Sequence, residues 1–304
     1  MNPHLTDLPI VPVLEGRRDV VVDLCRSHRV LHVGCVDAGH LHERFRRGEL
    51  LHQQLASVAM DLWGVDIDPE GISFLRSVGF ANLFVGDACR LGDLQELHAR
   101  HFGVIVACEV IEHLQNPGQF LVSVKRLMDP GGTRLVVSVP CAFRMSTLAW
   151  LLRGKEYVHP EHLYYFSYRT LTNLLTQNGL QVDRMYCYSY QYGDVAPQRL
   201  RVPHSESPAG PDGRRVHRDG RSPASGALRR AYVSLRRFPS RLIASLLFRT
   251  SSFWGDGIIA VASVPGNAGE GQTTMTGGAG VRQAIDAESD SMFSWPGCGR
   301  SHVP

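Results

Sequence analysis

The chain has 304 residues, 43% of them hydrophobic and 20% charged, which is enough apolar material for a sizeable core. The formal net charge of +3 is too small to indicate a nucleic-acid partner, and no stretch reaches the roughly 18 apolar residues of a membrane span. The seven cysteines form no CxxC pair and the N-terminus has no secretory pattern, so we expect reduced thiols and a cytoplasmic location.

Short apolar runs alternate with helical patterns along the first two thirds of the chain. We expect strands near residues 29–35, 62–68, 82–88, 102–110 and 133–140, which lack the polar alternation of a half-exposed sheet. We expect helices over 41–60, 68–80, 116–132 and 167–179, the second of them starting at an Asp68 N-cap with proline at the first helical position. This alternation predicts a doubly wound α/β domain.

The remaining segments divide the chain further. We expect an N-terminal segment over 1–27, a core over 28–191 that ends in a sixth strand, an insertion over 192–254, a closing strand over 255–264 and a disordered tail over 265–304. Twelve arginines lie between Arg199 and Arg249, and the second half of the insertion has apolar residues at helical spacing. Three interpretations stay open: a solvated lid, a helix over 227–249 on an anionic membrane surface, and RNA contact. RNA has the least support, because no aromatic-interleaved basic motif is present.

Four expected strands end in residues suited to a nucleoside. A tight turn at Gly34 follows the first strand, and Asp66, Asp87 and Glu109 follow the next three. Parallel strands present their carboxyl ends at one sheet edge, where open α/β sheets bind ligands, and carboxylates there can accept hydrogen bonds from ribose and adenine. Each acid alone can equally be a helix cap or part of a turn. The joint arrangement favours a nucleoside site.

The segments VLHVGC, WGVDID, VGDA, EVIEHLQNPGQF, LMDPGG and HPEHLYYFS resemble, in this order, class I S-adenosylmethionine-dependent methyltransferases of a branch with an EVIEH segment. The resemblance covers residues 28–190 and the strand near 255–264. It implies a Rossmann-like seven-stranded sheet with the last strand antiparallel, and S-adenosylmethionine as cofactor. It also implies these cofactor-binding residues: Gly34, Cys35, Asp37, Asp66, Ile67, Asp87, Ala88 and Glu109.

The turn after the first strand departs from the family pattern DxGCGxG. His32 replaces the leading acid, and Val36 and Ala38 replace the second and third glycines. We expect Val36 to be awkward, because a β-branched side chain resists positive φ and would fill space near the methionine part of the cofactor. Asp37 can offer the carboxylate that the missing acid would have supplied. A turn that still binds and a relic that does not are both open.

The helix expected over 41–60 is longer than usual for the family. We expect His40, His42 and His52 to be surface residues rather than metal ligands, since no cysteine or acid joins them at ligand spacing.

Candidate catalytic residues lie at the acceptor end of this edge. Methyl transfer from a sulfonium is an in-line displacement, and a protonated nucleophile also needs a base. His113, His159 and His162 are the candidates, because imidazole titrates near neutral pH, although His113 can instead cap or pack the next helix. An alternative, by resemblance to magnesium-binding small-RNA 2′-O-methyltransferases, is a metal site of Glu109, Glu112, His113 and His162.

Aromatic residues surround the HPEH segment. Tyr157, Tyr164, Tyr165 and Phe166 can wall an acceptor pocket or belong to the core.

We therefore predict a methyltransferase that acts on an oxygen, or else a nitrogen, of a small molecule such as a sugar or secondary metabolite. The main alternative is a methyltransferase-fold protein that binds a partner without turnover, suggested by His32 and Val36. An NAD-binding oxidoreductase would share Asp66 but leaves the EVIEH segment unexplained. The acceptor and the oligomeric state stay open.

Overall fold

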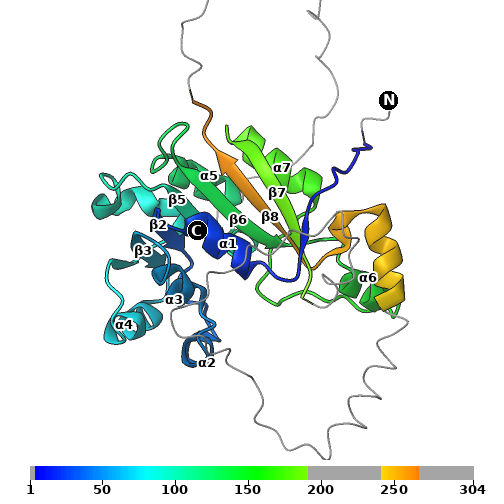
Figure 1. Ribbon diagram of the computed structural model, residues 1–304, viewed down its shortest axis with the longest axis horizontal. Helices are drawn as coiled ribbons and strands as arrows, with labels where there is room; N and C mark the ends of the chain where they lie inside the picture. The colour runs from blue at the N-terminus through cyan, green and yellow to red at the C-terminus, as the bar shows by residue number, and fades with distance from the viewer. Residues whose placement is uncertain (1–3, 191–240, 267–304) are drawn as a thin grey trace, which may run out of the picture. The chain divides into compact units, whose positions relative to one another are not determined.

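A mixed eight-stranded sheet with helices on both faces organises residues 4–190 and 241–266, the part of the chain that the computed structural model describes (Figure 1). The strand order is β1-β7-β8-β6-β5-β2-β3-β4. β8 is antiparallel to both of its neighbours, and every other pairing is parallel. The strands are β1 (Val13–Leu14), β2 (Arg29–Val33), β3 (Asp61–Asp66), β4 (Leu83–Val85), β5 (Val104–Cys108), β6 (Arg134–Pro140), β7 (Gln181–Tyr188) and β8 (Gly257–Ser263).

The predicted fold class is confirmed, with one added strand. All seven predicted strands form, and the last is antiparallel. The eighth strand, β1, has two residues and extends the edge beside β7. So short a strand has no detectable alternation in the sequence, and it lies within the predicted N-terminal segment 1–27. That segment also supplies helix α1 (Arg18–Cys25), whose Val21 and Cys25 are fully buried.

Seven further helices can be named in the described residues. They are α2 (Leu41–Arg46), α3 (Leu51–Ala56), α4 (Pro69–Ser77), α5 (Pro117–Lys125), α6 (Met145–Leu151), α7 (Tyr168–Gln177) and a helix over residues 241–250. The single helix expected over 41–60 is wrong, because the chain breaks into α2 and α3 around Gly48, whose φ is +66°. The predicted cap of α4 is confirmed: the Asp68 carboxylate accepts the N–H groups of Glu70 and Gly71.

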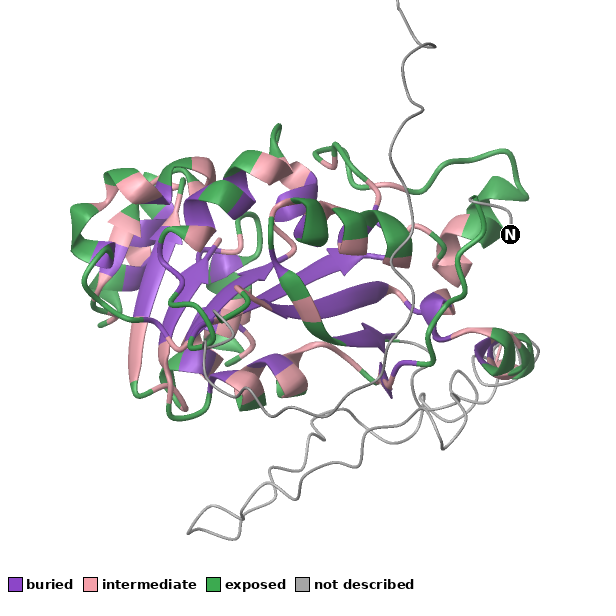
Figure 2. Cartoon of the chain, turned by 90° about the horizontal axis from the view of Figure 1, so that it is seen from above, coloured by how far each residue is buried: buried purple, intermediate pink, exposed green. Residues whose placement is uncertain are grey.

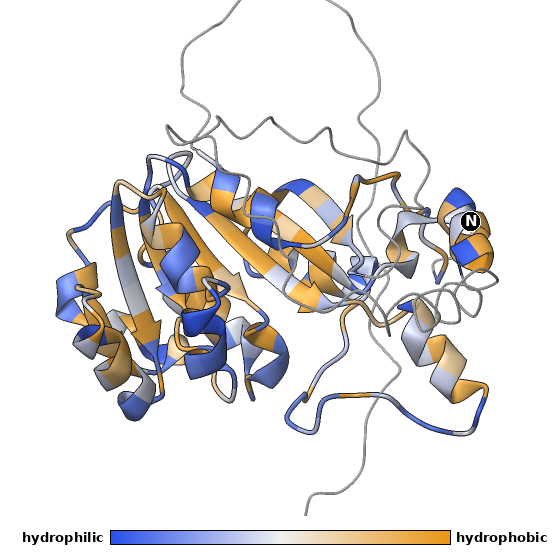
Figure 3. Cartoon of the chain, turned by 60° about the horizontal axis from the view of Figure 1, so that its bottom comes forward, coloured by the Kyte–Doolittle hydropathy of each residue, from blue (hydrophilic) through white to orange (hydrophobic). Residues whose placement is uncertain are grey.

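Two layers of apolar packing cover the sheet. In β2, Leu31 and Val33 pack with α5 and α7, whereas Val30 packs with α1 and α3. Successive strand residues point to opposite faces, so a continuous apolar run is buried on both sides. The strands are buried along most of their length in Figure 2, and hydrophobic residues concentrate on them in Figure 3. This packing explains the absence of polar alternation in the sequence.

Some of the predicted segments lie partly outside the described residues. Residues 191–240 of the basic insertion and residues 267–304 of the tail lie there, as does most of the membrane-contact segment 227–249. In the helix over 241–250, Ala244 and Phe248 are buried, whereas Leu242, Ile243 and Leu246 are exposed. Among the helices that are described, none combines the length and apolar character needed to cross a membrane. The six described cysteines are all free thiols.

Candidate functional site

A groove of about 540 Å³ lies at the carboxyl ends of β2, β3, β4 and β5. These four strands are neighbours in the sheet. The chain runs outward from β2 to β3 and β4 and then crosses back to β5 on the other side of β2. Such a reversal is where open α/β sheets bind ligands. All of the predicted cofactor-binding and catalytic residues line this groove: Gly34, Cys35, Asp37, Asp66, Ile67, Asp87, Ala88, Glu109, His113, His159 and His162.

Asp66 ties the turn after β2 to the end of β3. Its Oδ2 accepts the N–H of Val36 at 2.8 Å, and its Oδ1 accepts the N–H of Asp68 at 3.0 Å. Burial raises the pKa of Asp66 above its ordinary value, and the two N–H groups act in the opposite direction by favouring the charged form. Asp66 is therefore a structural residue of the turn as well as a groove residue.

The expectation that Val36 is forced toward positive φ is wrong. The left-handed residues of this turn are Gly34, Asp37 and Gly39, with φ of +75°, +60° and +81°. An aspartate tolerates that conformation better than a β-branched residue does. The Val36 side chain is fully buried against Gly71 of α4, so it packs into the protein instead of filling the groove.

Asp37 has a partner that the sequence did not reveal. Its carboxylate forms an ion pair with Arg44 of α2, which also lines the groove. The negative charge expected near the methionine part of the cofactor is thus present and partly neutralised. Asp37 lies in the turn before α2, so no helical spacing in the sequence marks this pair.

His32, at the position of the family's leading acid, is buried beside His52. Their Nδ1 atoms lie 3.3 Å apart and the rings stack at 5.5 Å. Burial lowers the pKa of both imidazoles, that of His52 to about 4, so both are neutral at pH 7. The expectation of a surface His52 is wrong, because α3 turns this side chain inward against Phe80. His40 and His42 are exposed as expected.

Glu109 is the centre of a polar network below the groove. Its Oε1 accepts hydrogen bonds from Ser138 Oγ at 2.9 Å and Tyr188 Oη at 3.0 Å, and it pairs with Arg17 Nη1 at 3.2 Å. Glu109 is also left-handed, with φ of +55°, a strained conformation for a non-glycine residue. Such strain is typical of functional sites. The carboxylate lies just after β5, on the side of β6 and β7, which supply Ser138 and Tyr188.

Arg17 is a groove residue that the sequence patterns do not predict. This arginine comes from the segment just before α1, which was set apart from the core, and it lines the groove beside Glu109. Its side chain is only 18% exposed. No local sequence motif marks it, because its place depends on how α1 packs across the sheet.

Glu112 lies in the protein interior and does not line the groove. Neither side-chain oxygen has a hydrogen-bond partner among the described residues. Burial, together with the nearby charge of Glu109, raises the pKa of this carboxyl well above its ordinary value. Its backbone oxygen accepts the N–H of Leu163 at 2.8 Å, which fastens the HPEH loop to the end of β5.

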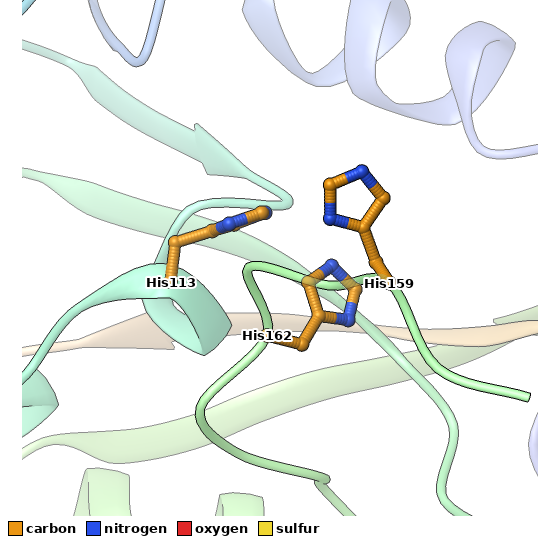
Figure 4. A group of neighbouring side chains, drawn as sticks. All are labelled: His113, His159 and His162. Carbon is orange, nitrogen blue, oxygen red and sulfur yellow. The ribbon is translucent and has the colours of Figure 1, made fainter. Parts of the chain in front are cut away.

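Three histidines converge at the open end of the groove (Figure 4). His113 ends the short helix η3 (Ile111–His113) after β5, and His159 and His162 lie on the loop between α6 and α7. Ring centroids are 4.6 Å apart for His113 and His162, 5.0 Å for His159 and His162, and 5.7 Å for His113 and His159. Burial, together with the neighbouring imidazoles, lowers the pKa of His113 and of His162.

Only part of the metal-ligand set that the resemblance implies lies together in the structure. His113 and His162 lie together, but the third residue beside them is His159 and neither glutamate. Glu109 is engaged by Arg17, Ser138 and Tyr188, and Glu112 is buried.

The aromatic residues of the HPEH loop divide between core and surface. Phe166 is buried in the core. Tyr157 and Tyr164 are exposed, and Tyr164 Oη donates to the backbone oxygen of Gln115 at 2.9 Å. Tyr165 Oη donates to the Tyr157 backbone oxygen at 2.9 Å. These hydroxyls hold the loop, and none of the four residues lines the groove.

Comparison with known proteins gives a consistent result. A family model described as a methyltransferase domain matches residues 19–184, more than half of the chain. The ubiquinone biosynthesis O-methyltransferase of Cereibacter sphaeroides is 25% identical over 208 residues, covering 60% of this chain and 74% of the relative. A protein of the same name from Roseobacter denitrificans is 24% identical over 171 residues, covering 51% of this chain and 61% of the relative. A solved SAM-dependent methyltransferase from Archaeoglobus fulgidus superposes with a TM-score of 0.43 at 16% identity, covering 82% of this chain and 96% of that one.

Proposed function

Because the chain belongs to the methyltransferase domain family and takes its methyl group from S-adenosylmethionine, we propose that it methylates an oxygen of a small molecule. The observation that carries the proposal is the single groove lined both by the expected cofactor residues and by three histidines. The O-methyltransferase names of the curated relatives support oxygen as the acceptor atom.

The residues at the sheet edge fit the cofactor by the chemistry of their side chains. S-adenosylmethionine supplies an electrophilic methyl group on a sulfonium sulfur. Asp66 and Asp87 are acceptors for the ribose hydroxyls and the adenine amino group, and the exposed Ile67 offers apolar surface to the base. The Arg17 guanidinium offers a partner for the carboxylate of the methionine part. Val36 leaves this site open, which favours a turn that still binds the cofactor over a relic.

At the acceptor end, the histidines provide the base. The acceptor oxygen gains the methyl carbon while the carbon–sulfur bond breaks, and an imidazole nitrogen takes the hydroxyl proton. His113 is the first candidate, because it ends the short helix after β5 and lines the groove together with the strained Glu109. His162 and His159 are the second and third, since they reach the same end of the groove from the HPEH loop.

The acceptor class is proposed as a hydroxylated small molecule. Sugars and secondary metabolites are the classes that the resemblance implies, and the relatives named for ubiquinone biosynthesis add precursors of that quinone. Peripheral membrane contact through 227–249 and a cytoplasmic location stay predictions.

The test uses the full chain, labelled S-adenosylmethionine and a panel of hydroxylated acceptors from these three classes. We expect labelled methyl ether product from wild type. We expect His113→Ala to reduce kcat about 100-fold or more with unchanged cofactor affinity, because loss of a general base costs at least about that factor. His101→Ala is the control, because His101 is exposed and precedes β5 at the opposite end of the strand. Cofactor binding without transfer to any acceptor would support the non-catalytic binding protein instead, and label on amines alone would support N-methylation.

A further inference from the structure

The three histidines at the end of the groove have the composition and spacing of a metal site. We propose that His113, His159 and His162 hold one divalent transition-metal ion of the zinc or cobalt type. One ligand atom from each ring lies within 4.8 Å of the other two. Figure 4 shows the three rings pointing toward a common space between η3 and the HPEH loop.

The spacing is close to that of a bound site. Zinc–nitrogen distances of about 2.0–2.1 Å in a tetrahedral site place two ligand nitrogens about 3.3 Å apart. The present nitrogens, at up to 4.8 Å, reach this separation by small side-chain rotations. His159 is exposed and His113 and His162 are partly exposed, so these rotations meet little resistance from the core.

The backbone that carries the rings is already fixed. The Leu163 N–H donates to the Glu112 backbone oxygen at 2.8 Å, and the His162 N–H donates to the His159 backbone oxygen at 3.0 Å. The first bond joins the loop to η3, whose His113 is 46 residues before His159, and the second fixes the turn inside the loop. A preorganised ligand set loses less conformational entropy on binding the ion.

The donor atoms select the class of metal. Imidazole nitrogens suit zinc, copper, iron and nickel, whereas magnesium and calcium prefer oxygen ligands. The nearest carboxylate is Glu161, whose Oε2 lies 3.9 Å from His113 Nδ1 and is well exposed. At that distance it forms no hydrogen bond with the ring, so the ligand set contains no carboxylate. The nitrogen-only set therefore predicts a borderline transition metal, in contrast to the magnesium site expected from resemblance.

The ion would have a place in the reaction. Three protein ligands leave at least one coordination position open, as in catalytic zinc sites. The same histidines line the groove with Gly34 and Asp66, so an ion held by them would lie in the groove that also holds the expected cofactor residues. An acceptor hydroxyl bound there would have a lowered pKa and would release its proton to solvent water, so in the metal-bound form the ion would replace the free imidazole as the means of activating the hydroxyl. Only this role rests on the proposed function, since binding of the ion does not require methyl transfer.

Cobalt binding to the untagged, chelator-treated full chain tests the site directly. Visible absorption follows the titration, because tetrahedral cobalt absorbs strongly, and zinc and magnesium are then added as competitors. We expect zinc to displace the cobalt and an equal concentration of magnesium to leave it bound. The variants His159→Ala and His162→Ala should weaken cobalt binding by about 100-fold or more. Loss of a residue that only orients a metal ligand costs about 10–100-fold in metal affinity, and loss of a ligand itself should cost at least the upper value. His101→Ala is the control and should bind as wild type does.

Three results would overturn the inference: no tetrahedral cobalt spectrum in wild type, equal binding by wild type and His159→Ala, or displacement by magnesium. His159 is exposed, so its loss should leave the fold intact, which thermal unfolding of the variant checks. Methyl transfer measured in parallel separates the two proposals. Transfer without cobalt binding refutes the metal site alone, and cobalt binding without transfer to any acceptor refutes the proposed function alone.

Discussion

Replacing Asp66 should weaken both the turn and the cofactor site, and a neighbouring acid provides a matched control. In Asp66→Ala, the buried N–H of Val36 and the partly buried N–H of Asp68 lose their acceptors. An unsatisfied buried donor costs about 1–3 kcal/mol, so the free energy of unfolding should fall by about 3 kcal/mol in total. The lost ribose partners should weaken S-adenosylhomocysteine binding by about 3 kcal/mol, or roughly 100-fold in Kd.

Asp68→Ala separates the two effects. The Asp68 carboxylate also accepts two backbone N–H groups, those of Glu70 and Gly71, but it caps α4 and is not part of the groove lining. Its loss should lower stability by about 1 kcal/mol, the usual value for an N-cap, and leave the affinity nearly unchanged. Urea unfolding measures stability, and calorimetric titration of S-adenosylhomocysteine measures affinity, at a temperature where both variants are folded.

The reasoning would be refuted if both variants lost affinity to the same degree. The affinity for S-adenosylhomocysteine would then depend on the folded conformation of the turn, and the Asp66 carboxylate would have no direct role in binding. If wild type does not bind S-adenosylhomocysteine, the turn is a relic of a cofactor site that no longer binds.

Further predictions concern the turn, the buried histidine pair and the metal alternative. Gly34→Ala should abolish cofactor binding, since an added Cβ would lie 2.6 Å from Val110 Cγ2 at a φ of +75°, whereas Gly39→Ala, with no atom within 4 Å, should lose only about 1 kcal/mol of stability. The pKa of His52 is lowered by burial from 6.5 to about 4, so its contribution to stability is present above pH 6.5 and is lost as the pH falls toward 4. Between pH 6.5 and pH 5, the free energy of unfolding of His52→Phe should therefore fall by about 2 kcal/mol less than that of wild type, measured by urea unfolding. Equal falls in the two proteins would contradict the buried neutral state of His52. If the histidines hold a catalytic ion, a chelator that strips zinc should lower kcat without changing S-adenosylhomocysteine affinity, and full turnover in excess chelator would rule out a catalytic role for the ion.

Local chemistry in the sequence was sufficient for most of the fold. The apolar runs of β2, β5, β6 and β8 follow from burial on both faces. Asp68-Pro69 begins α4 because an aspartate cap and a proline suit the first turn. The eight cofactor residues and three histidines could be placed at one edge because parallel strands end there. Break points were harder, since the left-handed Gly48 splits a helix that periodicity alone extends over 41–60.

The sequence by itself determined the order of the elements and the residues at the strand ends. Only the tertiary structure decided which of those residues meet. Arg17 reaches Glu109 across 92 residues of chain, and His159 joins His113 through a loop fastened by backbone bonds, so no local spacing reports either pair. Likewise, the Val36 side chain does not block the groove, because it packs against Gly71 of α4. Asp37, and not Val36, has the left-handed backbone conformation. Contacts between distant segments depend on how helices pack across the sheet, which a pattern of neighbouring residues does not encode.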